Sequence, residues 1–175
     1  MRYIALLRGI NVGGNMMIKM AELKSSFEKL GFKNVVSYIN SGNLAFDATK
    51  SSEEKICTKI ETAIEKDFGK AVPVMIREQG AIKTVLDSNP FHGLFDTHKH
   101  MHVLFMKEKM PKEKQEQLKA AETEYEKFEV IDREIYALLK EGVADSVLGK
   151  GFIERKLKVS ITGRNWRTVE KLAEL

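Results

Sequence analysis

The amino-acid sequence predicts an α+β protein made of two tandem ferredoxin-like subdomains, each with the order β-α-β-β-α-β, packed as one compact unit. Three observations support this prediction. Apolar residues switch between strand-like and helical spacing along the chain, the same order of elements occurs twice, and the 175 residues have a globular composition, with 43% hydrophobic and 31% charged residues. We place the first subdomain at residues 1–78 and the second at residues 79–175.

The first half shows this order most clearly. The predicted elements are a strand at 2–8, a helix at 19–30, strands at 35–39 and 44–46, a helix at 51–68 and a strand at 72–76. The second helix is the best defined, because apolar residues recur at every fourth position from Ile56 to Phe68. Ser51 or Ser52 offers an N-cap for this helix, and Gly69 ends it.

The second half repeats the order more loosely. Its predicted elements are a helix at 79–86, a strand at 100–106, a helix at 111–124, strands at 126–131 and 135–139, a helix at 145–157, a strand at 158–161 and a last helix from Trp166. Pro90 ends the first of these helices, because proline disfavours a helical conformation in the residue before it. Pro111 fits the first turn of the next helix. The two halves show no residue-level sequence identity, so the predicted repeat rests on the order of the elements alone.

Two polar, glycine-bearing segments of the first half are expected to lie side by side. In this topology the first and second strands run in the same direction. The loop after the first strand (8–15) and the turn at 40–43 therefore leave the same end of the sheet. The candidate ligand-binding residues in these segments are Arg8, Asn11, Gly13, Gly14, Asn15, Ser41 and Asn43. The corresponding segments of the second half, 107–110 and 132–134, lack this composition, which points to a single site.

The composition of these segments favours an anion. Exposed backbone N–H groups in a glycine-rich loop, with Arg8 as the charge partner, are suited to a small anionic or phosphorylated ligand. A purely structural interpretation stays open, since glycine permits positive φ angles and Asn-Ser-Gly-Asn is good turn chemistry. The loop matches neither the Walker A pattern nor GxGxxG.

A further polar segment, residues 162–168, precedes the last helix. Asn165 is expected to cap that helix. Arg164 and Arg167 then stand at the positive end of the helix dipole, where either a protein carboxylate or a bound anion would offset their charge. We therefore add Arg164 and Asn165 to the candidate ligand-binding residues.

The sequence predicts neither a metal site nor a cofactor. His98, His100 and His102 alternate as ligands on one face of a strand would, but no nearby cysteine or carboxylate completes a zinc set. Serine, histidine and acidic residues form no recognisable catalytic motif. Whether the protein is an enzyme stays open at this stage.

Charge and apolar patterning indicate a cytoplasmic protein. No apolar run approaches the roughly 20 residues needed to cross a bilayer, and Arg8 interrupts the short apolar start. The net charge of +4 favours anionic partners mildly, with lysines spread among glutamates. The lone Cys57 lies on a helical apolar face and is expected to be a buried, inert thiol.

Four segments carry a resemblance to a known family. They are Leu7-Arg8-Gly9-Ile10-Asn11-Val12-Gly13-Gly14, Tyr38-Ile39-Asn40-Ser41-Gly42-Asn43, Asn89-Pro90-Phe91 and Arg164-Asn165-Trp166-Arg167-Thr168-Val169. These segments resemble the uncharacterised bacterial family named domain of unknown function 1697. The resemblance implies two ferredoxin-like subdomains in one compact unit, and it brings no established activity, cofactor or catalytic residue. Gly163 and the histidine cluster depart from the family's pattern.

Three functions are compatible with the sequence. The leading one is the binding of a small anionic ligand, with or without chemistry, at the loop and turn described above. The first alternative is nucleic-acid binding, because folds of this topology include RNA-recognition domains, although Tyr3, Tyr38 and Phe46 form no RNP1 pattern. The second is an adaptor or structural role with no ligand. The oligomeric state is left open.

Overall fold

The computed structural model describes residues 1–14 and 16–175. The chain divides into two compact units, which are described separately. Unit 1 contains residues 1–83 together with 172–175, and unit 2 contains residues 84–171. The division falls a few residues after position 78, and the last four residues of the chain belong to the first unit.

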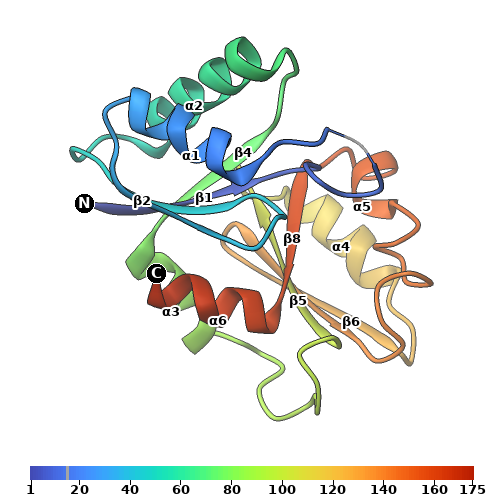
Figure 1. Cartoon of the computed structure of the whole chain (residues 1–175). Coiled ribbons are helices and arrows are strands. Elements are labelled where there is room, and N and C mark those ends of the chain that lie inside the picture. Colours follow the sequence, from blue (N-terminus) through green and yellow to red (C-terminus); the bar gives the residue numbers. More distant parts are fainter. Residues whose placement is uncertain (15) are drawn as a thin grey trace. The chain divides into compact units, whose positions relative to one another are not determined.

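Unit 1 has a four-stranded antiparallel sheet in the order β2-β3-β1-β4. Its elements are β1 (Arg2–Leu7), α1 (Met20–Lys29), β2 (Lys33–Tyr38), β3 (Asn43–Asp47), α2 (Glu53–Phe68) and β4 (Val74–Glu78). Helix α3 (Gln79–Asp87) follows, and its residues from Thr84 onwards belong to unit 2. Figure 1 shows α1 and α2 on one face of this sheet. The arrangement is the predicted ferredoxin-like one, with β1 and β2 parallel to each other on either side of β3.

The core of unit 1 lies between the sheet and these two helices. Tyr3 and Phe46 are fully buried there and stack with their ring centroids 5.9 Å apart. Of the predicted apolar stripe of α2, Ile56, Ile60 and Ile64 are buried, and Phe68 is partly buried against the same core. The helix begins where Ser52 accepts a hydrogen bond from the backbone N–H of Lys55 (3.3 Å), and it ends at Gly69 in the left-handed conformation, φ 73°. Both predicted helix boundaries are therefore confirmed.

Unit 2 repeats the same topology, with strand order β6-β7-β5-β8. Its elements are β5 (Met101–Met106), α4 (Lys112–Ala120), β6 (Glu126–Ile131), β7 (Glu134–Leu139), α5 (Phe152–Arg155) and β8 (Ile161–Asn165). Helix α6 (Trp166–Glu174) follows, and its residues from Leu172 onwards belong to unit 1. Leu104 and Met106 of β5 are buried in its core together with Leu118 of α4 and Ile153 of α5. The prediction of two tandem ferredoxin-like subdomains is confirmed.

Two predicted elements of unit 2 are wrong. The helix expected at 145–157 is reduced to the short α5, because Gly151 takes the left-handed conformation (φ 70°) just before it. A Cβ atom on Gly149 would lie 2.3 Å from the carbonyl oxygen of Val143, so the chain turns sharply there. The strand expected at 158–161 instead begins at Ile161 and runs to Asn165, where it pairs with β5.

The two units also share residue-level features. The N–H of Leu7, at the end of β1, donates to Gly42 (2.8 Å), and the N–H of Met106, at the end of β5, donates to Arg133 (2.9 Å). Arg77 and Arg164 each occupy the fourth position of the last strand of their unit, are at least nine-tenths buried, and donate Nη1 to the carbonyl of the preceding residue at 2.8 Å. The structure thus shows equivalent residues in a repeat that the sequence indicated only through element order.

Candidate functional site

The loop from β1 to α1 (residues 8–19) and the β2–β3 turn (residues 39–42) meet at one end of the unit 1 sheet. The backbone bond from Leu7 to Gly42 joins them at their base. A second bond, from Asn11 Nδ2 to the carbonyl oxygen of Asn40 (2.8 Å), joins them further out. The expectation that the two segments lie side by side is confirmed, and we call them together the loop cluster.

Asn11 holds the loop cluster together through both ends of its amide. Its Oδ1 accepts from the backbone N–H of Ile18 (2.7 Å), while Nδ2 donates to the carbonyl oxygens of Ile18 (2.9 Å) and Asn40 (2.8 Å). Its backbone is left-handed (φ 55°), a conformation that asparagine tolerates better than most residues. The side chain is committed to protein partners, so Asn11 shapes the loop.

Asn43 has a similar role on the other segment. It is fully buried, and its Nδ2 donates to the carbonyl oxygen of Tyr38 (3.1 Å) and to Ser41 Oγ (3.0 Å). Ser41 is half-buried at the turn. Asn43 therefore fixes the conformation of the β2–β3 turn, and Ser41 is the side chain of this pair that is nearer to solvent.

The glycines of the loop present backbone to solvent. Gly13 and Gly14 are exposed and left-handed, with φ 60° and 76°, and nothing lies within 4 Å of the position of a Cβ atom on either. Within the described residues, their N–H groups donate no hydrogen bond. Arg8 is half-buried at the base of the same loop, and its own N–H donates to Pro73 (3.0 Å). Asn15, the remaining candidate of this loop, lies outside the described residues.

Arg164 and Asn165 belong to unit 2. Asn165 Oδ1 accepts from the N–H and the Oγ1 of Thr168, both at 2.9 Å, so it caps α6 as predicted. Arg164 donates Nη1 to Thr162 Oγ1 (2.8 Å) and to the carbonyl oxygen of Gly163 (2.8 Å). Burial lowers the pKa of the Arg164 guanidinium to about 10. A ligand role for these two residues stays a prediction.

The histidine segment of unit 2 has one unusual member. His102 of β5 is mostly buried, and its Nδ1 has no hydrogen-bond partner in the described structure. Burial, followed by the nearby His100 and His98, lowers its pKa to about 4. No group of three or more histidine, cysteine or acidic side chains among residues 1–14 and 16–175 is placed to hold a metal ion.

The low pKa of His102 predicts acid sensitivity. The folded state holds the proton less tightly than the unfolded state, whose pKa is near 6.5. The free energy of unfolding therefore has its full value above pH 6.5. It falls by about 2–3 kcal/mol as the pH decreases towards 4, because protonation of His102 favours the unfolded state. Urea unfolding at pH 7 and pH 4 should show a smaller acid loss for His102→Gln than for the wild type. The exposed His92→Gln is the control, and an unchanged pH slope in His102→Gln would contradict this prediction.

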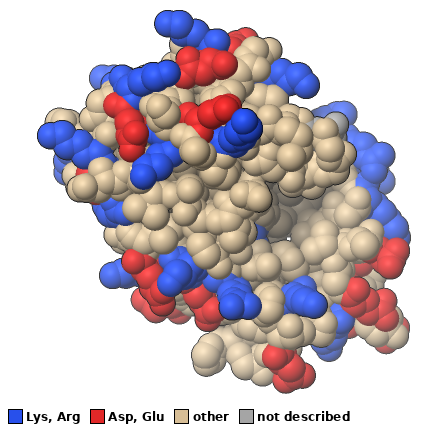
Figure 2. Space-filling view, viewed as in Figure 1, with Lys and Arg blue, Asp and Glu red and all other residues tan. Residues whose placement is uncertain are grey.

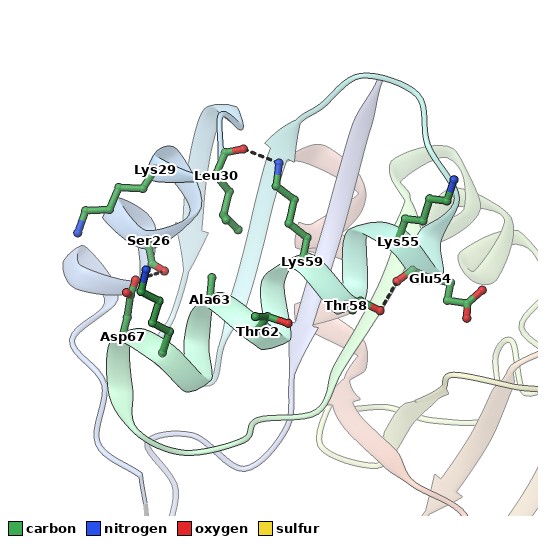
Figure 3. Close-up of a pocket in the computed structure, with 11 residues that line it drawn as sticks. Ser26, Lys29, Leu30, Glu54, Lys55, Thr58, Lys59, Thr62, Ala63 and Asp67 are labelled. Carbon is green, nitrogen blue, oxygen red and sulfur yellow. Dashed lines mark hydrogen bonds between the residues drawn. The ribbon is translucent and has the colours of Figure 1, made fainter.

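The structure also shows a surface groove that sequence reasoning missed. It lies between α1 and α2, has a volume of about 750 Å³, and includes Lys29, Lys55 and Lys66 in its lining. Figure 3 shows Lys29 and Lys55 at opposite ends of the groove. Lys59 is bound to the end of α1, with Nζ 2.8 Å from the carbonyl oxygen of Leu30.

The charges around this groove are mixed. Figure 2 shows lysines and arginines interspersed with acidic residues over α1 and α2. In the groove itself, Ser26 donates to Asp67 (2.6 Å) and links the two helices. The groove therefore has polar groups that hold α1 against α2. Lys29, Lys55 and Lys66 in its lining belong to a surface with charges of both signs, as the sequence indicated.

The fold and the loop cluster define the structural class of this protein. It consists of two ferredoxin-like subdomains, and the first of them carries a glycine-rich loop cluster. The family model described as "Protein of unknown function (DUF1697)" matches residues 1–136, and the chain belongs to that family. The expected family resemblance is therefore confirmed.

One solved structure similar to this chain is that of the conserved bacterial protein SP0830 from Streptococcus pneumoniae. Its sequence is 26% identical, the match covers 99% of this chain and 97% of the other, and the TM-score is 0.79. No curated protein matches the chain. Among the described residues, no helix has the length and apolar character required to cross a membrane.

Proposed function

We propose that the protein binds a small anionic or phosphorylated ligand at the loop cluster of unit 1. The observation that carries this proposal is the pair of exposed left-handed glycines, Gly13 and Gly14, whose N–H groups donate no hydrogen bond within the described structure. Arg8 at the base of the loop supplies positive charge. Backbone N–H groups together with a guanidinium form a common kind of anion site.

The remaining candidate residues of the loop cluster have two different roles in this proposal, contact with the ligand and support of the loop. In this proposal the half-buried Ser41 is a ligand contact, whereas Asn11 and Asn43 hold the two segments in position through their own hydrogen bonds. The corresponding loop of unit 2 has no such glycines, and Lys109 there forms an ion pair with Asp132 of the turn (2.8 Å). Unit 1 is therefore the better candidate of the two.

Nucleic-acid binding through stacked aromatics has less support. Tyr3 and Phe46 are fully buried beneath α1 and α2, so neither presents a ring face to a base without unfolding of the unit. RNA-recognition domains of this topology use exposed strand aromatics for that purpose. The anion proposal therefore takes precedence over the nucleic-acid alternative.

A thermal-shift titration tests the proposal. Pyrophosphate and sulfate, compared with sodium chloride at equal ionic strength, should raise the unfolding midpoint of the wild type. A ligand at 100 times its dissociation constant stabilises the folded state by about 2.7 kcal/mol. Arg8→Ala should remove most of the shift, whereas Arg167→Ala, which removes the same charge from an exposed site in unit 2, should keep it. A midpoint that neither anion raises, or an undiminished shift in Arg8→Ala, would contradict the proposal.

A further inference from the structure

The loop cluster exposes apolar side chains beside its polar groups. Val12, Met17 and Ile39 are 59%, 72% and 50% exposed. Val12 follows Asn11 in the chain, and Met17 and Ile39 each precede a residue to which the Asn11 side chain binds. The three side chains thus come from positions that one set of hydrogen bonds holds together. We call them the apolar patch.

Ile39 adopts a backbone conformation that does not suit its side chain. Its φ angle is 50°, in the left-handed region, where β-branched residues are rare. The first residue after the corresponding strand of unit 2 is Asp132, also left-handed with φ 53°. Aspartate enters this region more readily than isoleucine. Unit 1 therefore has a strained apolar residue where the same fold elsewhere has a suitable polar one.

The stability of the fold does not explain why position 39 is an isoleucine. Ile39 is 50% exposed, so its burial contributes little to the core, while the left-handed backbone lowers stability. Met17 and Val12 are exposed to a similar or greater extent. Exposed apolar side chains at three positions of one loop cluster, one of them strained, are compatible with a surface that contacts a ligand. The apolar patch is therefore expected to be covered when the loop cluster is occupied.

We propose that the ligand of the loop cluster is a nucleoside phosphate. The inference rests on the proposed function: the phosphate groups lie at the N–H groups of Gly13 and Gly14 and at Arg8, and the base lies against the apolar patch. An inorganic anion would leave the patch in water. A planar base fits an open surface of branched aliphatic and thioether side chains, because methionine adapts its shape and makes favourable contacts with aromatic rings.

The comparison of ATP with tripolyphosphate tests the base contact directly. Both carry three phosphate groups, and only ATP carries a base and a sugar. Isothermal titration of the full chain, with sodium salts at equal ionic strength and without divalent metal, should give ATP a dissociation constant at least about tenfold lower than that of tripolyphosphate, since tenfold corresponds to one modest apolar contact.

Ile39→Asn separates the ligand contact from stability. Asparagine accepts the left-handed backbone, so this variant should unfold at the same or a higher temperature than the wild type. Its affinity for ATP should fall to that for tripolyphosphate, which should be unchanged. The matched control is Ile131→Asn, which replaces an isoleucine of 40% exposure at the end of the corresponding strand of unit 2 and should keep the preference for ATP.

The outcomes distinguish this inference from the proposed function. Equal affinity of the wild type for the two ligands, or a preference for ATP that persists in Ile39→Asn, overturns the nucleoside assignment and leaves the anion proposal standing. Binding of neither ligand overturns both proposals. Loss of the preference in Ile131→Asn as well as Ile39→Asn also overturns the assignment, because the base would then depend on a residue outside the loop cluster.

Discussion

Replacing Gly42 with alanine should destabilise the protein by about 3 kcal/mol. A Cβ atom at this position would lie 2.7 Å from Leu7 Cβ and 2.9 Å from Ile10 Cδ1, so strand β1 or the loop after it must shift. Overpacking of this kind costs about 1–3 kcal/mol. The φ angle of 81° adds the strain of a left-handed alanine, about 1 kcal/mol. Urea unfolding followed by far-ultraviolet circular dichroism measures the loss.

Gly14→Ala is the matched control for this prediction. Gly14 has nearly the same φ angle, 76°, but nothing lies within 4 Å of its Cβ position. This variant should therefore lose only the strain contribution, about 1 kcal/mol. The difference between the two variants measures the close approach of the β2–β3 turn to β1. Equal losses in Gly42→Ala and Gly14→Ala would show that this approach can relax without cost.

The sequence is sufficient to predict that the two segments of the loop cluster meet. Strand order follows from the alternation of elements, and the order β-α-β-β-α-β leaves the loop after β1 and the β2–β3 turn at the same end of the sheet. Glycine at positions 13, 14 and 42 is compatible with the left-handed angles observed there. Element order and turn chemistry are local properties, so a single sequence reveals them.

The functions of individual residues in the loop cluster could not be predicted in the same way. The sequence suggests Asn11 as a ligand contact, yet its amide binds Ile18 and Asn40, which come close only when the loop folds back and the turn arrives beside it. The left-handed angle at Ile39 contradicts its own propensity and is imposed by the turn. The shift of β8 to residues 161–165 likewise follows from pairing with β5, a contact distant in sequence.

The same division between local and long-range information applies to the buried arginines. Arg77 and Arg164 lie at equivalent strand positions and fold back on their own chain in the same way. In the sequence, however, the neighbouring residues differ, Ile76 and Glu78 in one unit and Gly163 and Asn165 in the other. Arginine is seldom buried, so the sequence does not indicate that either side chain is buried. The equivalence of Arg77 and Arg164 follows from their positions in the two sheets, which depend on long-range strand pairing.

The second large effect is expected at Asn11. Asn11→Asp keeps an acceptor for the N–H of Ile18 but replaces the Nδ2 donor, which faces the carbonyl oxygens of Ile18 and Asn40 at 2.9 Å and 2.8 Å, with a carboxylate oxygen. Placing a charged acceptor against two carbonyl oxygens should lower the free energy of unfolding by about 3 kcal/mol at pH 7. Urea unfolding gives the value.

Acidification should partly reverse this loss. The carbonyl oxygens disfavour the ionised form, so the folded-state pKa of the new carboxyl group lies above its unfolded value of about 3.9. Protonation provides one O–H donor, and the variant therefore regains stability as the pH falls through the folded pKa. Asn11→Gly, which allows the left-handed backbone and has no side chain, should lose about 2 kcal/mol with no such recovery relative to the wild type. If Asn11→Asp and Asn11→Gly show the same pH dependence, the amide of Asn11 does not join the two segments as a donor, because only a lost donor is restored by a proton.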